Sequence, residues 1–187
     1  MRRLCFVIPL TIGLAACAGS SAFPPTSPYY RIPAGSRVIV KQSLPIPANR
    51  SRAWIQYGKV IHKKERDQYY PHCWFLSHKR SDSPREIKPD TFTVVETRKL
   101  EEYVADQRSF RLAASRHLGG LFAQDGATAI EYITEIRITS SRQPDIAVLS
   151  CSQWSDPSDA QHMTLLEINQ VLGELAVIEP AEASTAP

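Results

Sequence analysis

Residues 69–76 read Tyr-Tyr-Pro-His-Cys-Trp-Phe-Leu and form the centre of a strong strand signal that extends over residues 68–79. Apolar side chains occur at both parities of this stretch: Tyr69, Cys73 and Phe75 on one side, Tyr70, Trp74 and Leu76 on the other. A strand that is apolar on both faces is typical of a position inside a sheet, or of one covered by another element. The fold is therefore expected to be organised around this strand.

Further strands are predicted on both sides of it from alternating apolar and polar residues. Their expected ranges are residues 37–42, 53–56, 59–62, 90–97, 127–140 and 146–154. Tyr57-Gly58 is a turn signal that joins two of them into a hairpin. Pro45 and Pro47 cannot donate to a ladder, so residues 44–50 are expected at an edge or in a connection. Residues 80–89 are expected to form a loop.

One helix is predicted near the C-terminus. Thr164 and Glu167 match a capping box, the apolar spacing that follows gives a helix over residues 165–173, and Gly173 is positioned to cap its end. Leu100, Tyr103 and Val104 also have helical spacing, so residues 98–126 are expected to form a short helix and a long excursion. Together these elements predict a mainly β fold, an antiparallel β-sandwich or open barrel with one C-terminal helix.

The N-terminus has the features of a bacterial export signal. Two arginines precede an apolar stretch, Leu4 to Leu14, that is too short to span a bilayer as a helix. Leu14-Ala15-Ala16-Cys17 resembles the lipobox of bacterial lipoproteins. The resemblance implies cleavage before Cys17, a diacylglyceryl thioether on its sulfur and an N-acyl chain such as palmitate. The alternative is ordinary secretion with Cys17 left as a thiol. In bacterial lipoproteins an aspartate directly after this cysteine favours retention in the inner membrane, so the resemblance, with Ala18 at that position, implies the outer membrane.

Four segments follow from this interpretation. They are a signal peptide (1–16), a lipidated cysteine with a proline-rich tether (17–35), a single β-rich domain (36–179) and a disordered tail (180–187). The tether is expected to be extended, because four prolines disfavour regular structure. Tyr29 and Tyr30 could mark where it docks, or cover an edge strand.

Two cysteines, Cys73 and Cys151, are left once Cys5 is removed with the signal and Cys17 is lipidated. In an oxidising periplasm the expected outcome is a disulfide between them, since both lie in strand-like stretches. Metal ligation and two unpaired thiols are the alternatives.

Charge and motifs restrict the possible functions. The chain has 22 Lys and Arg against 19 Asp and Glu, which becomes 20 against 19 without the signal, so nothing favours a nucleic-acid partner. No hydrolase, zinc, phosphate-loop or redox motif occurs. His72 and His78 are too far apart along a strand to share a metal, and both are expected at the surface. Pairs such as Glu101/Glu102 and Glu131/Glu135 are expected to be solvated.

The residues around the predicted hairpin form the best candidate for a binding surface. They are Arg50, Arg52, Tyr57, Lys59, Lys63 and Lys64, and with Arg66 they make the 50–66 segment basic. Such a face could meet an anionic lipid head group or peptidoglycan carboxylates. The alternative is that the lysines only protect an exposed sheet edge from aggregation.

Three stretches, residues 44–50, 68–73 and 87–92, resemble small uncharacterised lipoproteins of proteobacteria, a resemblance that implies location and no activity. We therefore expect a lipoprotein anchored on the periplasmic face of the outer membrane. It would carry no cofactor beyond its lipids, and it would bind an envelope protein or peptidoglycan, or act as an accessory in envelope assembly, without catalysis. The competing hypothesis is an envelope enzyme or small-ligand binder with a site under residues 98–126, lined by residues such as Tyr103, Arg111 and His117.

Overall fold

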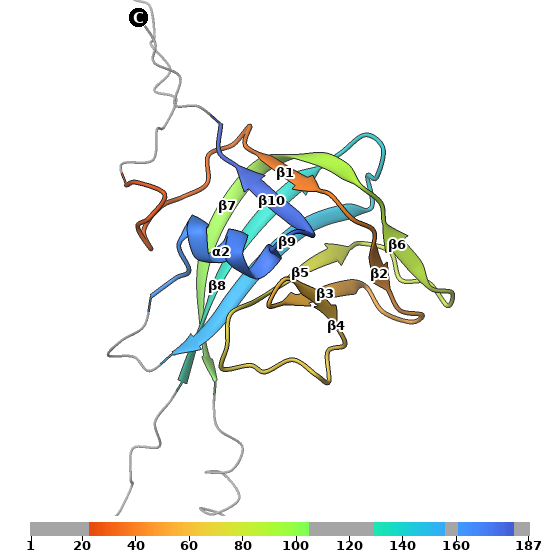
Figure 1. The fold of residues 1–187 in the computed structure, drawn as a ribbon, viewed down its shortest axis with the longest axis horizontal. Helices are drawn as coiled ribbons and strands as arrows, with labels where there is room; N and C mark the ends of the chain where they lie inside the picture. The colour runs from red at the N-terminus through yellow and green to blue at the C-terminus, as the bar shows by residue number, and fades with distance from the viewer. Residues whose placement is uncertain (1–22, 105–128, 156–160, 182–187) are drawn as a thin grey trace, which may run out of the picture.

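The computed structural model describes residues 23–104, 129–155 and 161–181, which form a mainly β fold (Figure 1). Its larger sheet has eight strands in the order β10-β1-β7-β8-β9-β5-β3-β4, and every neighbouring pair is antiparallel. The strands are β1 (Arg37–Val40), β3 (Arg52–Gln56), β4 (Lys59–Ile61), β5 (His72–Ser77), β7 (Asp90–Val104), β8 (Ala129–Thr139), β9 (Ile146–Ser155) and β10 (Ala176–Glu179). The sheet curls into a half-barrel, so the predicted mainly β antiparallel class is confirmed.

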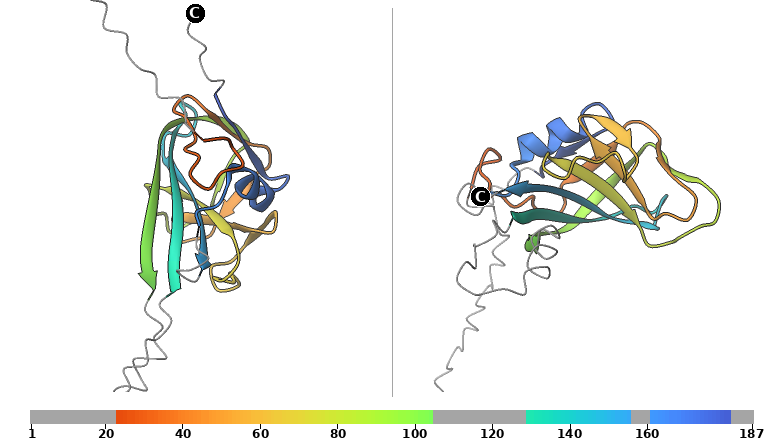
Figure 2. Two further views of the ribbon diagram at one scale, coloured as in Figure 1. Left: turned by 90° about the vertical axis from the view of Figure 1, so that its left-hand side faces the viewer. Right: turned by 90° about the horizontal axis from the view of Figure 1, so that it is seen from below.

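The helix α2 (Leu165–Leu172) lies against the inner face of the curled sheet (Figure 2). Its Ile168 and Leu172 are buried in one hydrophobic core with Phe75, Phe92 and Leu149 from the strands. The capping box is confirmed: the Thr164 hydroxyl accepts from the Glu167 N–H, and the Glu167 carboxylate accepts from the Thr164 N–H. Gly173 ends the helix as predicted.

The central position predicted for the 68–79 stretch is confirmed for its second half. β5 lies between β3 and β9 in the sheet. The strand begins only at His72, however, because residues 67–71 leave the sheet and are held by a buried side chain. The amide of Gln56 donates to the Asp67 carbonyl at 2.8 Å and accepts from the Asp67 N–H at 3.1 Å.

Residues 98–104 are a strand, so the short helix predicted there is wrong. β7 continues to Val104 and pairs with β8 as far as Ala129, which satisfies its backbone groups in a ladder. Leu100 and Tyr103 are both exposed at this end, and they point to opposite faces. The helical spacing of these residues therefore does not correspond to a common buried face. In Figure 1, β7 and β8 extend together beyond the rest of the sheet.

Three further strands lie where none was expected. β2 (Leu44–Ile46) and β6 (Arg85–Ile87) pair with each other in a separate two-stranded sheet, which replaces the predicted connection and loop. Pro45 is tolerated because a strand in a two-stranded sheet has a free edge. β10 pairs with β1 and forms an edge of the large sheet.

The described part of the predicted tether lies against the domain. Tyr30 and Ile32 belong to the buried core, and the Ile32 carbonyl accepts from the Thr97 hydroxyl. The Pro25 carbonyl accepts from the Leu165 N–H at the start of α2. Contacts with the domain therefore begin well before residue 36, and Tyr30 is a docking residue.

The β3–β4 turn packs directly on the end of α2. Tyr57 and Gly58 both have positive φ, 53° and 69°, as a two-residue turn of this type requires. The Gly58 N–H donates to the Val171 carbonyl at 2.9 Å. A Cβ on Gly173 would lie 2.7 Å from the Gly58 Cα, so two glycines allow the turn and the helix end to meet.

Candidate functional site: a basic groove beside the edge strand

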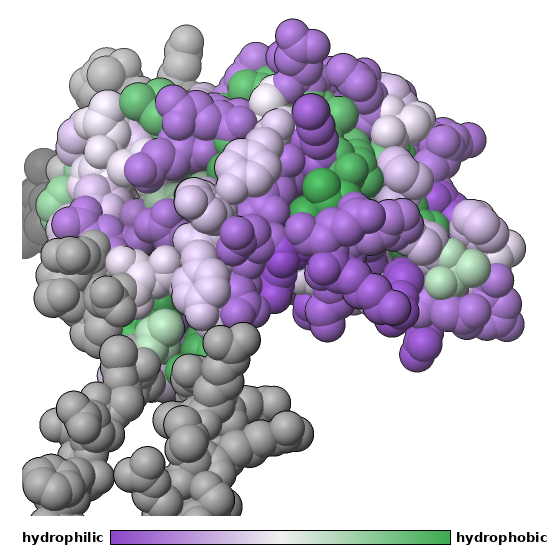
Figure 3. All heavy atoms as spheres, turned by 60° about the horizontal axis from the view of Figure 1, so that its bottom comes forward, coloured by the Kyte–Doolittle hydropathy of each residue, from purple (hydrophilic) through white to green (hydrophobic). Residues whose placement is uncertain are grey.

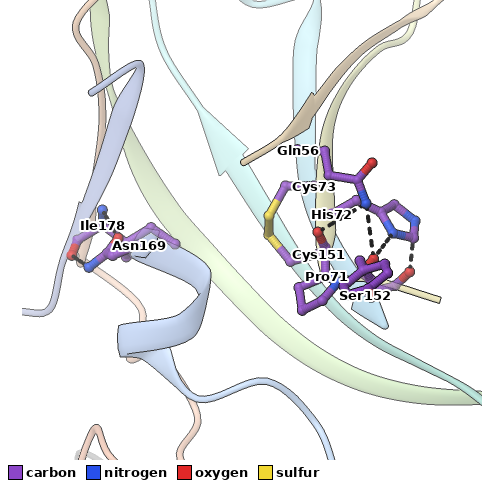
Figure 4. The surroundings of a disulfide bond; sticks show 9 residues. Gln56, Pro71, His72, Cys73, Cys151, Ser152, Asn169 and Ile178 are labelled. Atoms are coloured by element: carbon purple, nitrogen blue, oxygen red, sulfur yellow. Dashed lines mark hydrogen bonds between the residues drawn. A yellow bond between two sulfur atoms is a disulfide. The ribbon is translucent and has the colours of Figure 1, made fainter. Parts of the chain in front are cut away.

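The predicted disulfide is present. Cys73 on β5 and Cys151 on β9 are directly opposite each other, with their Cα atoms 4.0 Å apart, and they are bonded through sulfur. Both side chains are fully buried and face the core (Figure 4). The two residues are therefore neither metal ligands nor free thiols, and the bond joins two neighbouring strands at the centre of the sheet.

An open groove of about 1070 Å³ lies beside the edge strand β4. Its lining comes from β2 and the connection that follows it, from β3, from β4 and the residues after it, and from the 80–84 segment. Six basic side chains line it: Arg50, Arg52, His62, Lys63, Lys64 and Arg80. On the side that carries β4 and the segment after it, hydrophobic surface is enclosed by hydrophilic side chains (Figure 3).

The groove includes four of the six residues that the sequence nominated. Arg50, Arg52, Lys63 and Lys64 are brought together because β3 and β4 are antiparallel, so the chain entering β3 runs beside the chain leaving β4. Lys59 and Tyr57 are not part of the lining. Tyr57 is at the opposite end of the hairpin, where its ring is 6.0 Å from that of Tyr70.

Arg80 is a groove residue that the sequence did not reveal. Its Nε donates to the Asn49 carbonyl at 3.0 Å, and the Asn49 N–H donates to the Ser81 carbonyl at 2.7 Å. These bonds hold the 80-segment beside residues 49 and 50, 31 positions earlier in the chain. The pairing of β2 with β6, which is not evident from the sequence, brings Arg80 close to Asn49 and Arg50.

The positive charge of the groove is largely uncompensated. Glu65 is the one acidic residue in the lining, and its carboxylate accepts from the His62 N–H. Within the described ranges, the five Lys and Arg side chains of the groove form no ion pair with a carboxylate. Arg52 instead lies over the rings of Trp54 and Trp74, at 5.6 and 5.3 Å from their centroids. The arrangement suits an anion.

A second polar cluster lies next to the groove on the outer face, the face of the sheet opposite α2. His72 is fully buried there, so the prediction that it is a surface histidine is wrong. β5 is covered on this face by the 66–71 segment: His72 Nδ1 donates to the Tyr70 carbonyl at 2.9 Å, and Arg66 donates to Nε2 at 2.9 Å. Burial, with Arg66 adding repulsion, lowers the pKa of His72.

Ser152 and Glu131 complete this cluster. The Ser152 hydroxyl lies 3.2 Å from His72 Nε2 and donates to the Glu131 carboxylate at 2.6 Å. Glu131 is therefore half-buried and hydrogen-bonded, which corrects the expectation that it is a solvated carboxylate. The hydroxyl proton and the imidazole lone pair are both already engaged, and both residues are fully buried. The cluster consequently joins strands β5, β8 and β9 and is not poised for nucleophilic catalysis.

No family model, curated protein or solved structure matches the chain. The described residues contain no cluster of three or more metal-ligating side chains. No helix among them has the length and apolar character needed to span a membrane. The function has to be inferred from the groove itself.

The competing site under residues 98–126 lies mostly outside the described residues, as do Arg111 and His117. Tyr103 is 75% exposed on β7. Nearby, burial lowers the pKa of the Lys99 amine to about 8, with Arg31 adding repulsion, and the amine donates to the Pro28 carbonyl. Burial lowers the pKa of His162 to about 4, with Lys99 adding repulsion. The Lys99 contact serves the docking of the N-terminal segment onto β7, whereas the ring of His162 packs edge-on against Tyr132 on β8.

The buried histidines predict a pH dependence of stability. The unfolded chain protonates His162 near pH 6.5, whereas the folded chain does so only near pH 4. The free energy of unfolding should therefore fall as pH drops through this window, and His72, whose pKa is also lowered, acts in the same direction. Urea unfolding at pH 7, 6, 5 and 4 should show a shallower loss for His162→Gln than for the wild type. Equal slopes would contradict the prediction.

Proposed function

We propose that the protein is a lipid-anchored binding module of the bacterial envelope, held on the periplasmic face of the outer membrane, and that its basic groove binds an anionic ligand without catalysis. The observation that carries the proposal is the groove, in which six basic side chains surround one carboxylate. Its basic residues come from the sheet edge and from the connected 80–84 segment, which the contact of Arg80 with the Asn49 carbonyl holds in place. The fully engaged Ser152–His72 pair supports a non-enzymatic role.

The anchor is proposed from the sequence, through the lipobox Leu14-Ala15-Ala16-Cys17. Several acyl chains on one residue give stable attachment, because each buried methylene contributes about 0.8 kcal/mol. Cys17 lies outside the described residues. The ordered contacts of Pro25, Tyr30 and Ile32 would place the domain close to its anchor.

Replacement of Cys17 tests the anchor. Cys17→Ala should abolish the incorporation of labelled palmitate that the wild type shows, since the variant has no sulfur for the diacylglyceryl thioether on which acylation depends. The Cys73–Cys151 disulfide reports folding in the same samples: its formation in both proteins, read on non-reducing gels, shows that the variant still folds. Absence of labelled palmitate from the wild type would exclude lipid anchoring.

Photo-crosslinking in intact cells tests the groove. A photoreactive residue at position 84, in the groove lining, should capture an anionic envelope component, whereas the same residue at position 59 should not. Arg50→Glu combined with Lys64→Glu should lower the yield from position 84 at least tenfold, because two attractions become repulsions. The matched control is Lys59→Glu, on the same hairpin but outside the groove. Equal yields from positions 84 and 59 would show that the groove is not the binding site.

A further inference from the structure

The floor of the groove is apolar, which its charge alone does not explain. Val60 and Ile61 on β4 are only partly buried, and Pro45, Pro47 and Pro84 add exposed apolar surface. Val60 packs against the inner core, and Ile61 packs against Trp54 and Trp74 on the outer face. Because β4 is the last strand of the sheet, its outer edge pairs with no further strand, and Val60 and Ile61 form an apolar strip that flanks this free edge from the two faces of the sheet.

The charges gather at one end of this strip. Trp54 is paired with Ile61, so Arg50 and Arg52 at the start of β3 lie beside His62, Lys63 and Lys64, which follow β4. The contact between Arg80 and Asn49 adds a further guanidinium at this end. The groove is thus amphipathic along its length. Aliphatic side chains lie in its floor, and the cations are concentrated at the end of the β3–β4 hairpin that is opposite its turn.

Neither a purely polar anion nor a purely apolar molecule complements this arrangement. A hydrophilic polyanion would leave Val60 and Ile61 against water or against polar groups, with no gain from their burial. An uncharged apolar ligand would desolvate several cations without a counter-charge, which is strongly unfavourable. Three arginines favour a phosphate, since the planar guanidinium donates two parallel hydrogen bonds to it.

We propose that the groove binds an anionic amphiphile, a phosphate-bearing acyl lipid. Its phosphate would lie among Arg50, Arg80 and Lys64, and its chain would lie along the free edge of β4, between Val60 on the inner face and Ile61 on the outer face. A volume of about 1070 Å³ slightly exceeds the usual range of small-molecule pockets, roughly 300–1,000 Å³, so this open groove has room for a head group together with a chain. The inference rests on the proposed anion-binding function and specifies its ligand class.

Three probes, added to the full chain carrying Cys17→Ala so that no lipid of its own is present, separate the contributions. The probes are lysophosphatidic acid with a twelve-carbon chain, below its micelle concentration, glycerol 3-phosphate and the corresponding monoacylglycerol. Each methylene transferred from water to apolar surface strengthens binding about fourfold. Titration calorimetry should therefore show lysophosphatidic acid binding at least tenfold more tightly than either of the other two.

Variants assign that binding to the groove. Arg50→Ala combined with Lys64→Ala should weaken the binding of lysophosphatidic acid at least tenfold. Val60→Ser should weaken it several-fold without affecting the binding of glycerol 3-phosphate. Lys59→Ala should change the affinity for neither lysophosphatidic acid nor glycerol 3-phosphate. Equal affinity for glycerol 3-phosphate and lysophosphatidic acid would overturn the amphiphile proposal and leave anion binding intact. No binding of any probe would also overturn it, and failure of crosslinking from position 84 would then remove the proposed function as well.

Discussion

Replacing both Cys73 and Cys151 with alanine should lower the free energy of unfolding by about 4–5 kcal/mol. The bond closes a loop of 78 residues, and removing it restores that much configurational freedom to the unfolded chain on the chain-entropy account. A domain of this size typically has only 5–15 kcal/mol of stability, so the variant should be near the threshold of folding at 37 °C.

Urea unfolding of wild type and variant, each with and without reductant, measures this effect. Reductant should destabilise the wild type and leave the variant unchanged. Because both cysteines are fully buried between β5 and β9, reduction of the native protein should require its unfolding and proceed slowly. A difference below 1 kcal/mol between the oxidised wild type and the variant would show that the unfolded chain is compact enough to lose little freedom from the bond.

Gly173→Ala should cost about 3 kcal/mol. Gly173 has φ 56° and ψ −133°, a region that is essentially restricted to glycine, and the strain of a side chain there is of order 1–3 kcal/mol. In addition, the new Cβ would lie 2.7 Å from the Gly58 Cα, a backbone atom that cannot rotate away. The β3–β4 turn and the end of α2 would have to separate, which would weaken the bond from Gly58 to the Val171 carbonyl.

Gly35→Ala provides the matched control. Gly35 also has a positive φ, 85°, but a Cβ there would meet only the Ala181 side chain at 3.9 Å, an ordinary contact. Its cost should therefore be about 1–2 kcal/mol, from backbone strain alone. Thermal and urea unfolding of both variants would isolate the contribution of the clash. Equal destabilisation would contradict the contact between Gly58 and Gly173.

The elements that sequence reasoning found are those with a local cause. The helix after Thr164 was predicted because its capping box and apolar spacing lie within a few residues. The disulfide was predicted because two cysteines remained and both lay in strand-like stretches. The central strand is predictable because Cys73 and Trp74 make both faces of this stretch apolar.

The elements that it missed depend on distant partners. The prolines of residues 44–50 predict a connection, and only the pairing of β2 with β6 shows that Pro45 lies in a strand. The 98–104 stretch is polar on much of its surface, and its strand character comes from the ladder with β8. The sequence places His72 at the surface because it does not show that β9 brings Ser152, 80 positions later in the chain, to 3.2 Å from the Nε2 of His72.

The candidate site was predicted in the same uneven way. Arg50, Arg52, Lys63 and Lys64 were found because they flank one hairpin, so a local pattern was enough. Arg80 and the residues of β2, Pro45 and Ile46, are not evident from the sequence, since they join the site only through tertiary structure. The sequence therefore indicated the sign of the charge but not the amphipathic character of the groove.

The neighbouring positions of β1 and β10 have a consequence for biosynthesis. The first strand of the large sheet is bonded on one side to the last, with Arg37 paired to Glu179 across 142 positions, and α2 supplies Ile168 and Leu172 to the core. A ribosome must therefore synthesise nearly the whole polypeptide before the hydrophobic core can close. Until then the hydrophobic core stays open, which is compatible with the proposed export of an unfolded chain across a membrane.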